Sequence, residues 1–261
     1  MKNIILILFA LTFFSSKLLS YNPEQFHTDY NEHLLKSLRK AVYNDLGASK
    51  FTIDYELTEY FLNSDPVKIY GFIGNELERI RVKINDVKLE SKSAGRYIIK
   101  GKTKVKNNIS EFAGHLQLKS VYEFKEPVTS HWLVMCRFSA VFKEIGSGSH
   151  KGEFTGDYYI ILSKIVDELR FAKAIPQFAK NHTFVGNWKS SDNKLHYPVL
   201  WGEDIMIEEL EDVYYGITIN PSVDDSKLEK SWKSFFDAFN YDNDEKLKEN
   251  AMKIETEKWW E

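Results

Sequence analysis

Residues 97–106, with the sequence YIIKGKTKVK, decide the fold together with the run that follows them as far as Leu162. Lysine occupies positions 100, 102, 104 and 106, whereas glycine, threonine and valine stand between them. Alternation with a period of two places successive side chains on opposite faces of an extended chain. The segment therefore predicts a β-strand with a lysine face and a face directed toward a core.

The same alternation returns in three later segments, residues 112–124, 132–142 and 154–162. Short connections rich in Asn, Gly and Ser join them, and parallel strands would need crossovers of about a dozen or more residues. An antiparallel meander is therefore predicted. The fold class is mainly β (α+β), and a curved sheet, a sandwich and a partly closed barrel all stay open. The positions predicted to face inward include Phe112, Leu116, Leu118, Phe124, Val134, Cys136, Phe138, Phe142, Phe154, Tyr158, Ile160 and Leu162.

Helices are predicted before and after this β structure along the chain. Asn22 and Pro23 suit the cap and the first position of a helix, so an N-terminal helix is expected over 23–46. A capping box that begins at Ser226 opens C-terminal helices over 224–260. With a β core over 50–164 and a mixed closing region over 165–222, these helices are expected to form a single mature domain, 21–261.

Three strands and two turns are predicted before residue 97, and the second and third strands are the apolar run 67–73 and the alternating segment that contains Ile80, Val82 and Ile84. Phe51, Ile53, Tyr55 and Leu57 alternate along the chain and predict the first strand. Gly74-Asn75 suits a two-residue hairpin turn. Asn85-Asp86 suits either another tight turn or a β-bulge, and the periodicity leaves these two alternatives open.

The first twenty residues predict a signal peptide. Met1-Lys2-Asn3 is a short positive start, and the apolar run from Ile4 to Phe14 is too short to cross a membrane but suits a secretory signal. Cleavage is expected near Ser20. The mature chain is then expected in the periplasm or outside the cell, with no transmembrane segment.

Charge is distributed unevenly along the chain. Residues 79–125 hold twelve Lys and Arg against four acidic residues, whereas residues 201–261 hold seven basic against seventeen acidic residues. Such a basic face could attract an anionic envelope polymer. The alternative is an ordinary sheet face in contact with solvent, whose charge the acidic C-terminal helices neutralise by folding over it. The negative net charge and the predicted export argue against a nucleic-acid partner. The basic face comprises Arg79, Arg81, Lys83, Lys100, Lys102, Lys104 and Lys106.

No metal or cofactor motif emerges from the chemistry-bearing residues. The seven histidines lack the spacing of a zinc site, and His27 and His33 are six positions apart. Cys136 is the only cysteine, which excludes an internal disulfide, and its inward position predicts a small buried side chain. We therefore predict no cofactor and no metal.

A hydrolase is the alternative class, and it would use His150, Glu153 and Asp157 first. Glu153 and Asp157 are four residues apart on the outward face of one predicted strand, too far apart to share a proton. They are expected to be surface carboxylates, and His150 is expected in a hairpin tip. No catalytic residue is assigned on this pattern.

Two resemblances accompany these patterns. The runs IKGKTKVKNNI (99–109), KGEFTG (151–156), FVGNW (184–188) and WGED (201–204) resemble a group of secreted, β-rich proteins from Bacteroidetes-type bacteria. This resemblance implies an exported β protein and supplies no activity. Gly186-Asn187-Trp188 is also similar to the Gly-x-Trp of lipocalin-type barrels, although that family places the motif on its first strand.

Taken together, the sequence predicts a non-enzymatic exported protein that binds a small apolar ligand or serves as a structural envelope component. An antiparallel sheet with an aromatic interior can hold an apolar ligand at a barrel mouth. The residues expected to line such a cavity are Phe112, Phe138, Phe154 and Tyr158. The alternative is a hydrolase acting on an envelope polymer or glycan, and the oligomeric state stays open.

Overall fold

The structure is a computed structural model of the whole chain, and it describes residues 22–38, 42–63, 65, 68–125, 132–146, 150–165, 168–172, 180–203, 205, 225–239 and 243–261. The predicted signal peptide, 1–20, lies outside these residues. So do residues 206–222 of the predicted closing region 165–222.

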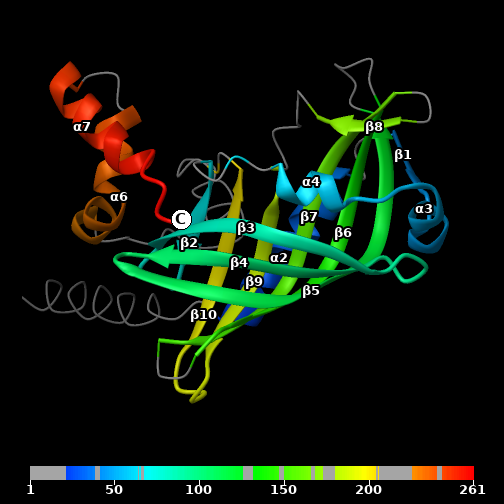
Figure 1. The fold of residues 1–261 in the computed structure, drawn as a ribbon, viewed down its shortest axis with the longest axis horizontal. Coiled ribbons are helices and arrows are strands. Elements are labelled where there is room, and N and C mark those ends of the chain that lie inside the picture. The colour runs from blue at the N-terminus through cyan, green and yellow to red at the C-terminus, as the bar shows by residue number, and fades with distance from the viewer. Residues whose placement is uncertain are drawn as a thin grey trace, which may run out of the picture.

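Eight antiparallel strands pair in sequence and return to the first, which confirms the predicted meander (Figure 1). The pairings close on themselves because β10 pairs with β2 and β5 pairs with both β4 and β6. The arrangement is therefore a ring rather than a sandwich. Its strands are β2 (Ile69–Ile73), β3 (Glu78–Ser91), β4 (Arg96–Val105), β5 (Asn108–Lys125), β6 (Trp132–Glu144), β7 (Gly152–Ile165), β9 (Thr183–Ser190) and β10 (His196–Glu203).

Two shorter strands extend the ring. β1 (Val42–Asp45) pairs with the C-terminal part of β5, and β8 (Glu168–Phe171) pairs with the C-terminal part of β7. The N-terminal helix is therefore shorter than predicted, because the residues before Gly47 form β1 rather than the end of a helix over 23–46.

Side chains fill the interior of the ring, and two short helices close one of its ends. α3 (Ala48–Asp54) and α4 (Thr58–Leu62) stand where the first strand was predicted, so that prediction is wrong. Phe61 of α4 is fully buried, with its ring centroid 5.2 Å from that of Tyr97 and 5.4 Å from that of Phe138. A short apolar run serves a helix or a strand equally well, and here burial of the aromatic rings inside the ring favours the helices.

Helix α2 (Pro23–Leu38) covers the outer face of β9 and β10. Its apolar stripe recurs every four residues, as the helical period requires, and is buried. The stripe consists of Phe26, Tyr30, Leu34 and Leu38. Together with outward-facing side chains of the strands it forms a second core outside the ring.

Helices α6 (Asp225–Phe239) and α7 (Glu245–Glu255) confirm the predicted C-terminal helices and lie together at one side of the ring (Figure 1). Asp244 caps α7 by accepting a hydrogen bond from the backbone N–H of Leu247 at 2.9 Å. Trp232 of α6 is fully buried, and its indole Nε1 donates to the backbone oxygen of Leu77 at 2.9 Å. This contact fixes α6 on the turn before β3.

The two predicted turns before residue 97 have different outcomes. Gly74-Asn75 is part of a four-residue connection, Gly74 to Leu77, so the two-residue hairpin is wrong. Leu77 is buried, and its place under α6 accounts for the wider turn. At Asn85-Asp86 strand β3 continues through a register shift, which settles the open choice in favour of a bulge.

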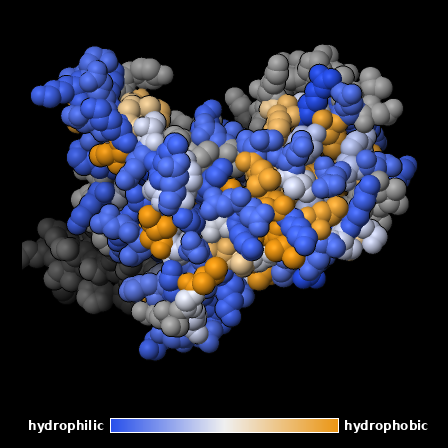
Figure 2. Space-filling model, viewed as in Figure 1, coloured by the Kyte–Doolittle hydropathy of each residue, from blue (hydrophilic) through white to orange (hydrophobic). Residues whose placement is uncertain are grey.

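The surface drawn in Figure 2 is mostly hydrophilic, with hydrophobic side chains gathered in patches near its centre. Within the described ranges, the structure has no helix of the length and apolar character that a membrane crossing requires.

Candidate functional site

The four aromatic residues predicted to line a ligand cavity all lie inside the ring. Phe112, Phe138, Phe154 and Tyr158 are each at most 2% exposed. All four pack against other aromatic rings, as in the centroid distances of 5.2 Å from Phe112 to Phe142 and 6.1 Å from Tyr158 to Phe61. The hydroxyl of Tyr158 lies 3.0 Å from His182 Nδ1. Phe154 also lines the pocket described next, and the other three are not in its lining. Most of the interior is therefore core rather than cavity.

A pocket of about 400 Å³ opens at the end of the ring opposite α4. We call it the mouth pocket. It lies where the turns β2–β3 and β4–β5 meet the ends of β6 and β9, far from Tyr97 at the start of β4. Its volume falls within the range of about 300–1,000 Å³ that is typical of small-molecule sites. It is lined by Ile73, Gly74, Asn75, Glu76, Glu78, Thr103, Val105, Lys106, Asn108, Ser110, Glu144, His150, Phe154, Trp188, Leu195 and Tyr197.

Glu144 is the buried acidic group of the mouth pocket. As the last residue of β6 it continues the inward positions of Phe138 and Phe142, and it is only 6% exposed. Its Oε2 accepts hydrogen bonds from Trp188 Nε1 and from the backbone N–H of Gly152, both at 2.9 Å. From the residues that the structure describes, its Oε1 accepts only a long bond of 3.4 Å from Thr103 Oγ1. One carboxylate oxygen is thus well satisfied, and the other has acceptor capacity left.

Aromatic side chains form the apolar wall beside Glu144. The rings of Trp188 and Tyr197 stack with centroids 5.8 Å apart and planes 9° apart. Gly152 permits this arrangement, because a Cβ atom there would stand 2.6 Å from Cε2 of Trp188 and would also meet the backbone oxygen of Lys189. The glycine therefore lets the indole N–H approach Glu144.

The lining of the mouth pocket is acidic on balance. Glu76, Glu78 and Glu144 contribute three carboxylates, and Lys106 contributes one ammonium group. Lys106 Nζ pairs with Glu78 Oε1 at 2.6 Å, whereas the buried Glu78 Oε2 has no hydrogen-bond partner among the described residues. Lys151 stands behind the wall and donates to Ser110 Oγ at 2.7 Å.

No group of three or more His, Cys, Asp or Glu side chains in the described parts of the chain is arranged to hold a metal ion. The three carboxylates of the mouth pocket are therefore not a ligand cluster.

The C-terminal helices cover part of the predicted basic face. Arg79 forms a two-point ion pair with Glu255 of α7, with N–O distances of 2.8 and 2.5 Å, and both side chains are buried. Arg81 donates to the backbone oxygen of Glu255 at 2.6 Å. Lys104 pairs with Glu257 at 3.2 Å. The C-terminal segment thus binds these three residues of the basic face, so the covering that the sequence left open as an alternative applies to part of this face.

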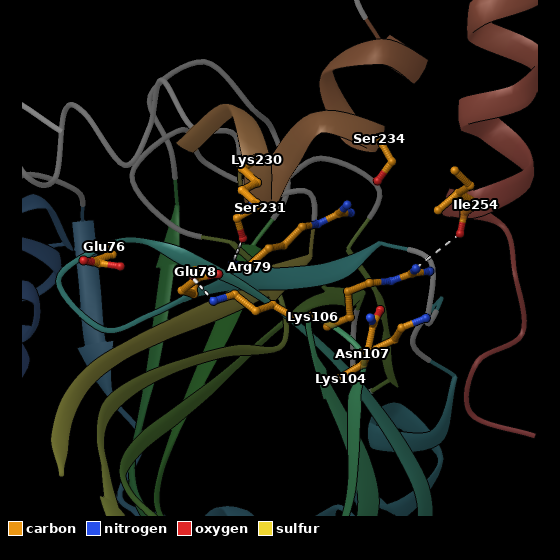
Figure 3. Close-up of a pocket in the computed structure, with 11 residues that line it drawn as sticks. Glu76, Glu78, Arg79, Lys104, Lys106, Asn107, Lys230, Ser231, Ser234 and Ile254 are labelled. Atoms are coloured by element: carbon orange, nitrogen blue, oxygen red, sulfur yellow. Dashed lines mark hydrogen bonds and ion pairs between the residues drawn. The ribbon is translucent and has the colours of Figure 1, made fainter. Parts of the chain in front are cut away.

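A groove of about 540 Å³ remains between this face and the C-terminal helices. Figure 3 shows Lys106 pointing to Glu78 and Arg79 passing close to Ser231, whose Oγ accepts from the backbone N–H of Arg79 at 2.7 Å. The arginines and lysines of the groove already have partners in Glu78, Glu255 and Glu257, apart from the exposed Lys230. The groove offers few groups to a further anion.

The remaining basic residues lie farther along the ring. Lys100 pairs with Asp86 at 3.7 Å and Lys102 with Glu111 at 4.0 Å, and such exposed pairs contribute little stability. Burial lowers the pKa of Lys83. The seven residues therefore do not form a single exposed cationic surface.

The three residues considered for a hydrolase do not come together. His150 is exposed and lines the mouth pocket, Glu153 is exposed on the outer face of β7, and Asp157 is buried on that outer face under α2. The prediction of a surface carboxylate at position 157 is therefore wrong, because the predicted N-terminal helix packs over this part of β7 and the sequence did not indicate which strands it covers.

Asp157 connects α2 to the ring. His27 Nε2 lies 2.7 Å from Asp157 Oδ2, and the same oxygen accepts hydrogen bonds from Asn31 Nδ2 at 2.7 Å and from Arg137 at 2.9 Å. Burial alone would raise the pKa of Asp157, but the hydrogen bonds from His27 and Arg137 lower it. No nucleophile is among these partners, and the cluster fastens the helix to the ring.

Comparison of the chain with known protein families, with curated proteins and with solved structures gave no match.

Sequence reasoning missed the central group of the mouth pocket, although a signal for it exists. Glu144 occupies an inward position of the alternating strand that contains Phe138 and Phe142. A charged side chain at an inward position needs a partner or a function. The sequence indicates Trp188 only as part of a short motif. It does not predict the contact with Glu144, because the two residues are 44 positions apart along the chain.

Proposed function

We propose that this protein is an exported, non-enzymatic binding protein that holds a small organic molecule in the mouth pocket. The observation that carries the proposal is the combination of a concave aromatic wall with one buried carboxylate at the open end of an otherwise filled ring. Small-molecule sites have this composition, with mostly apolar walls and a few polar groups that fix orientation.

The filled interior limits where the ligand lies. Phe61, Phe138 and Tyr158 occupy the half of the ring near α4. The ligand therefore contacts Phe154, Trp188 and Tyr197 rather than the whole set of aromatic residues predicted from the sequence.

Export is proposed from the sequence of the first twenty residues, with their positive start and apolar run. A hydrolase is not favoured, because His150, Glu153 and Asp157 point to separate regions of the molecule.

Native mass spectrometry of the protein isolated from the cells that make it tests the proposal. We expect a bound mass beyond that of the polypeptide, and we expect denaturation to release it. Leu195→Trp places a large ring in the pocket wall and should abolish the bound mass. Met252→Trp adds a similar ring at an exposed position of α7 and should leave it unchanged.

A second measurement uses the stability of the purified protein. A ligand that binds only the folded state at 100 times its Kd stabilises it by about 2.7 kcal/mol, which corresponds to a rise in Tm of roughly 5–10 °C for a chain of this size. Bare polypeptide in the mass spectrum, together with no rise in Tm for any small molecule in a broad panel, would leave a structural role in the envelope instead.

A further inference from the structure

We infer that the ligand of the mouth pocket is an organic amine whose ammonium group pairs with Glu144 Oε1 and whose apolar body lies against Phe154, Trp188 and Tyr197. This inference rests on the proposed function and names the chemical class of the ligand.

The first argument is that the two carboxylate oxygens of Glu144 differ in their hydrogen bonding. Oε2 receives two N–H donors at 2.9 Å, which fix the carboxylate in place. Among the described residues, Oε1 receives a single hydroxyl at 3.4 Å, longer than the usual distance for a hydrogen bond between oxygens. A buried carboxylate oxygen with so weak a partner is costly unless a donor reaches it. An ammonium group supplies such a donor together with the opposite charge.

The second argument is the absence of a protein cation for this carboxylate. None of the ion pairs between described residues includes Glu144. Lys106, the one lysine of the lining, is 2.6 Å from Glu78, and Lys151 donates to Ser110. A cationic ligand would supply the partner that these lysines do not give to Glu144.

The third argument separates an amine from a metal ion. A divalent cation needs several oxygen or nitrogen ligands around one point, and the described side chains form no such cluster. The pocket instead combines one available carboxylate oxygen with three aromatic residues. This combination suits a molecule with one cationic end and an apolar or aromatic body.

A series of three probes with the same body tests the inference. The probes are 3-phenylpropylamine, 3-phenylpropanol and 3-phenylpropanoate, which end in an ammonium, a hydroxyl and a carboxylate group. Isothermal titration at pH 7.5 keeps the amine protonated and histidine mostly neutral. We expect the amine to bind at least tenfold more tightly than the alcohol, and the carboxylate to bind most weakly.

The Glu144→Gln variant tests whether the preference for the amine over the alcohol depends on the charge of Glu144. The amide oxygen can still accept from Trp188 and Gly152, so the wall stays in place while the charge is lost. We expect the affinity for the amine to fall at least tenfold and the affinity for the alcohol to change less than threefold. Glu153→Gln is the matched control, because it removes the same charge from the exposed outer face of β7 and should change neither affinity.

The outcomes separate the inference from the function on which it rests. Equal affinities for the amine and the alcohol would overturn the inference and leave a binding protein for neutral molecules. An amine preference that survives Glu144→Gln, or that disappears in 0.5 M salt, would overturn it too, because a diffuse acidic field rather than a buried pair would then be responsible. Failure of all three probes to bind overturns the inference for this class of amine, and the native mass spectrum then decides the proposed function alone.

Discussion

Gly152 shows how one residue shapes the mouth pocket. It begins β7 directly beside Trp188, and its backbone N–H donates to Glu144. The missing side chain is what allows the indole to lie so close.

Gly152→Ala is therefore expected to destabilise the protein by about 1–3 kcal/mol, the usual cost of forcing extra atoms into a packed region. It should also shift Trp188 away from Glu144. Urea unfolding measures the first effect, and a change in tryptophan fluorescence reports the second. Glu153→Ala, one position along and exposed, should alter the free energy of unfolding by less than about 0.5 kcal/mol. Equal stabilities of the two variants would contradict the close packing at Gly152.

His182 gives the protein a predictable response to mild acid. Burial, followed by the charge of Lys83, lowers its pKa from 6.5 to about 4. Between these two values the unfolded chain binds a proton at His182 and the folded chain does not. The stability that this residue contributes is therefore complete above pH 6.5 and is lost as the pH falls toward 4, with a slope of at most about 1.4 kcal/mol per pH unit.

His182→Asn should flatten this part of the stability profile. Asparagine tolerates the positive φ of 52° at this position better than most residues. Urea unfolding at several pH values between 4 and 7 measures the slope for both proteins. A variant that keeps the slope of the unmodified chain would show that another group titrates in this range. Asp157 should act at lower pH, because its folded pKa lies below its ordinary value.

Among the elements, the long strands were the most predictable and the short ones the least. β4, β6 and β7 follow from alternation because each carries ten or more residues of one period. In β5 a register shift after Leu118 reverses the two faces, so the prediction that Phe124 faces inward is wrong, and its ring lies in the second core outside the ring of strands. The segment from Phe51 to Leu57 alternates over too few residues to distinguish a strand from the helices that close the ring. Its conformation depends on distant contacts, such as the hydrogen bond from the backbone N–H of Leu57 to the hydroxyl of Tyr97 at 3.2 Å.

The candidate site was predictable only in part, for the same reason. Alternation correctly placed Phe112 and Phe154 inside. It gave no indication of which interior positions are filled, because that depends on α4 entering from one end. The covering of Arg79 and Asp157 by helices likewise arises from contacts across more than a hundred residues.

Helix α7 depends on the buried pair between Arg79 and Glu255 for its place on the ring. Removal of one partner of a buried pair leaves an uncompensated charge, at a cost of about 3–5 kcal/mol. We expect Glu255→Ala to lower stability by this order and to release α7, which hydrogen exchange of the helix would detect. Glu257→Ala is the control, because its pair with Lys104 is largely exposed and contributes about 1 kcal/mol or less. An α7 that stays protected in Glu255→Ala would show that its apolar contacts suffice.

For the molecule as a whole, Cys136 reports on the integrity of the ring. The thiol lies inside, is fully buried, and has its pKa raised by burial. Because the thiolate is the reactive form, we expect a disulfide reagent to modify Cys136 only as fast as the protein unfolds. The reaction can be followed by absorbance across a series of urea concentrations. Met252→Cys adds an exposed thiol on α7 that should react at once. Rapid modification of the unmodified chain without urea would mean that the ring opens locally.

The ring of strands also affects how readily the protein aggregates at high concentration. A free strand edge recruits another chain, because its backbone N–H and C=O groups seek partners. In the described part of the chain every strand of the ring has a neighbour on each side over at least part of its length. The unpaired edges are those of β1 and β8, each only four residues long, and that of β3 beyond Arg81, which pairs with β4 alone. Sheet-to-sheet aggregation should therefore start at one of these segments, and a proline placed in that segment would suppress it.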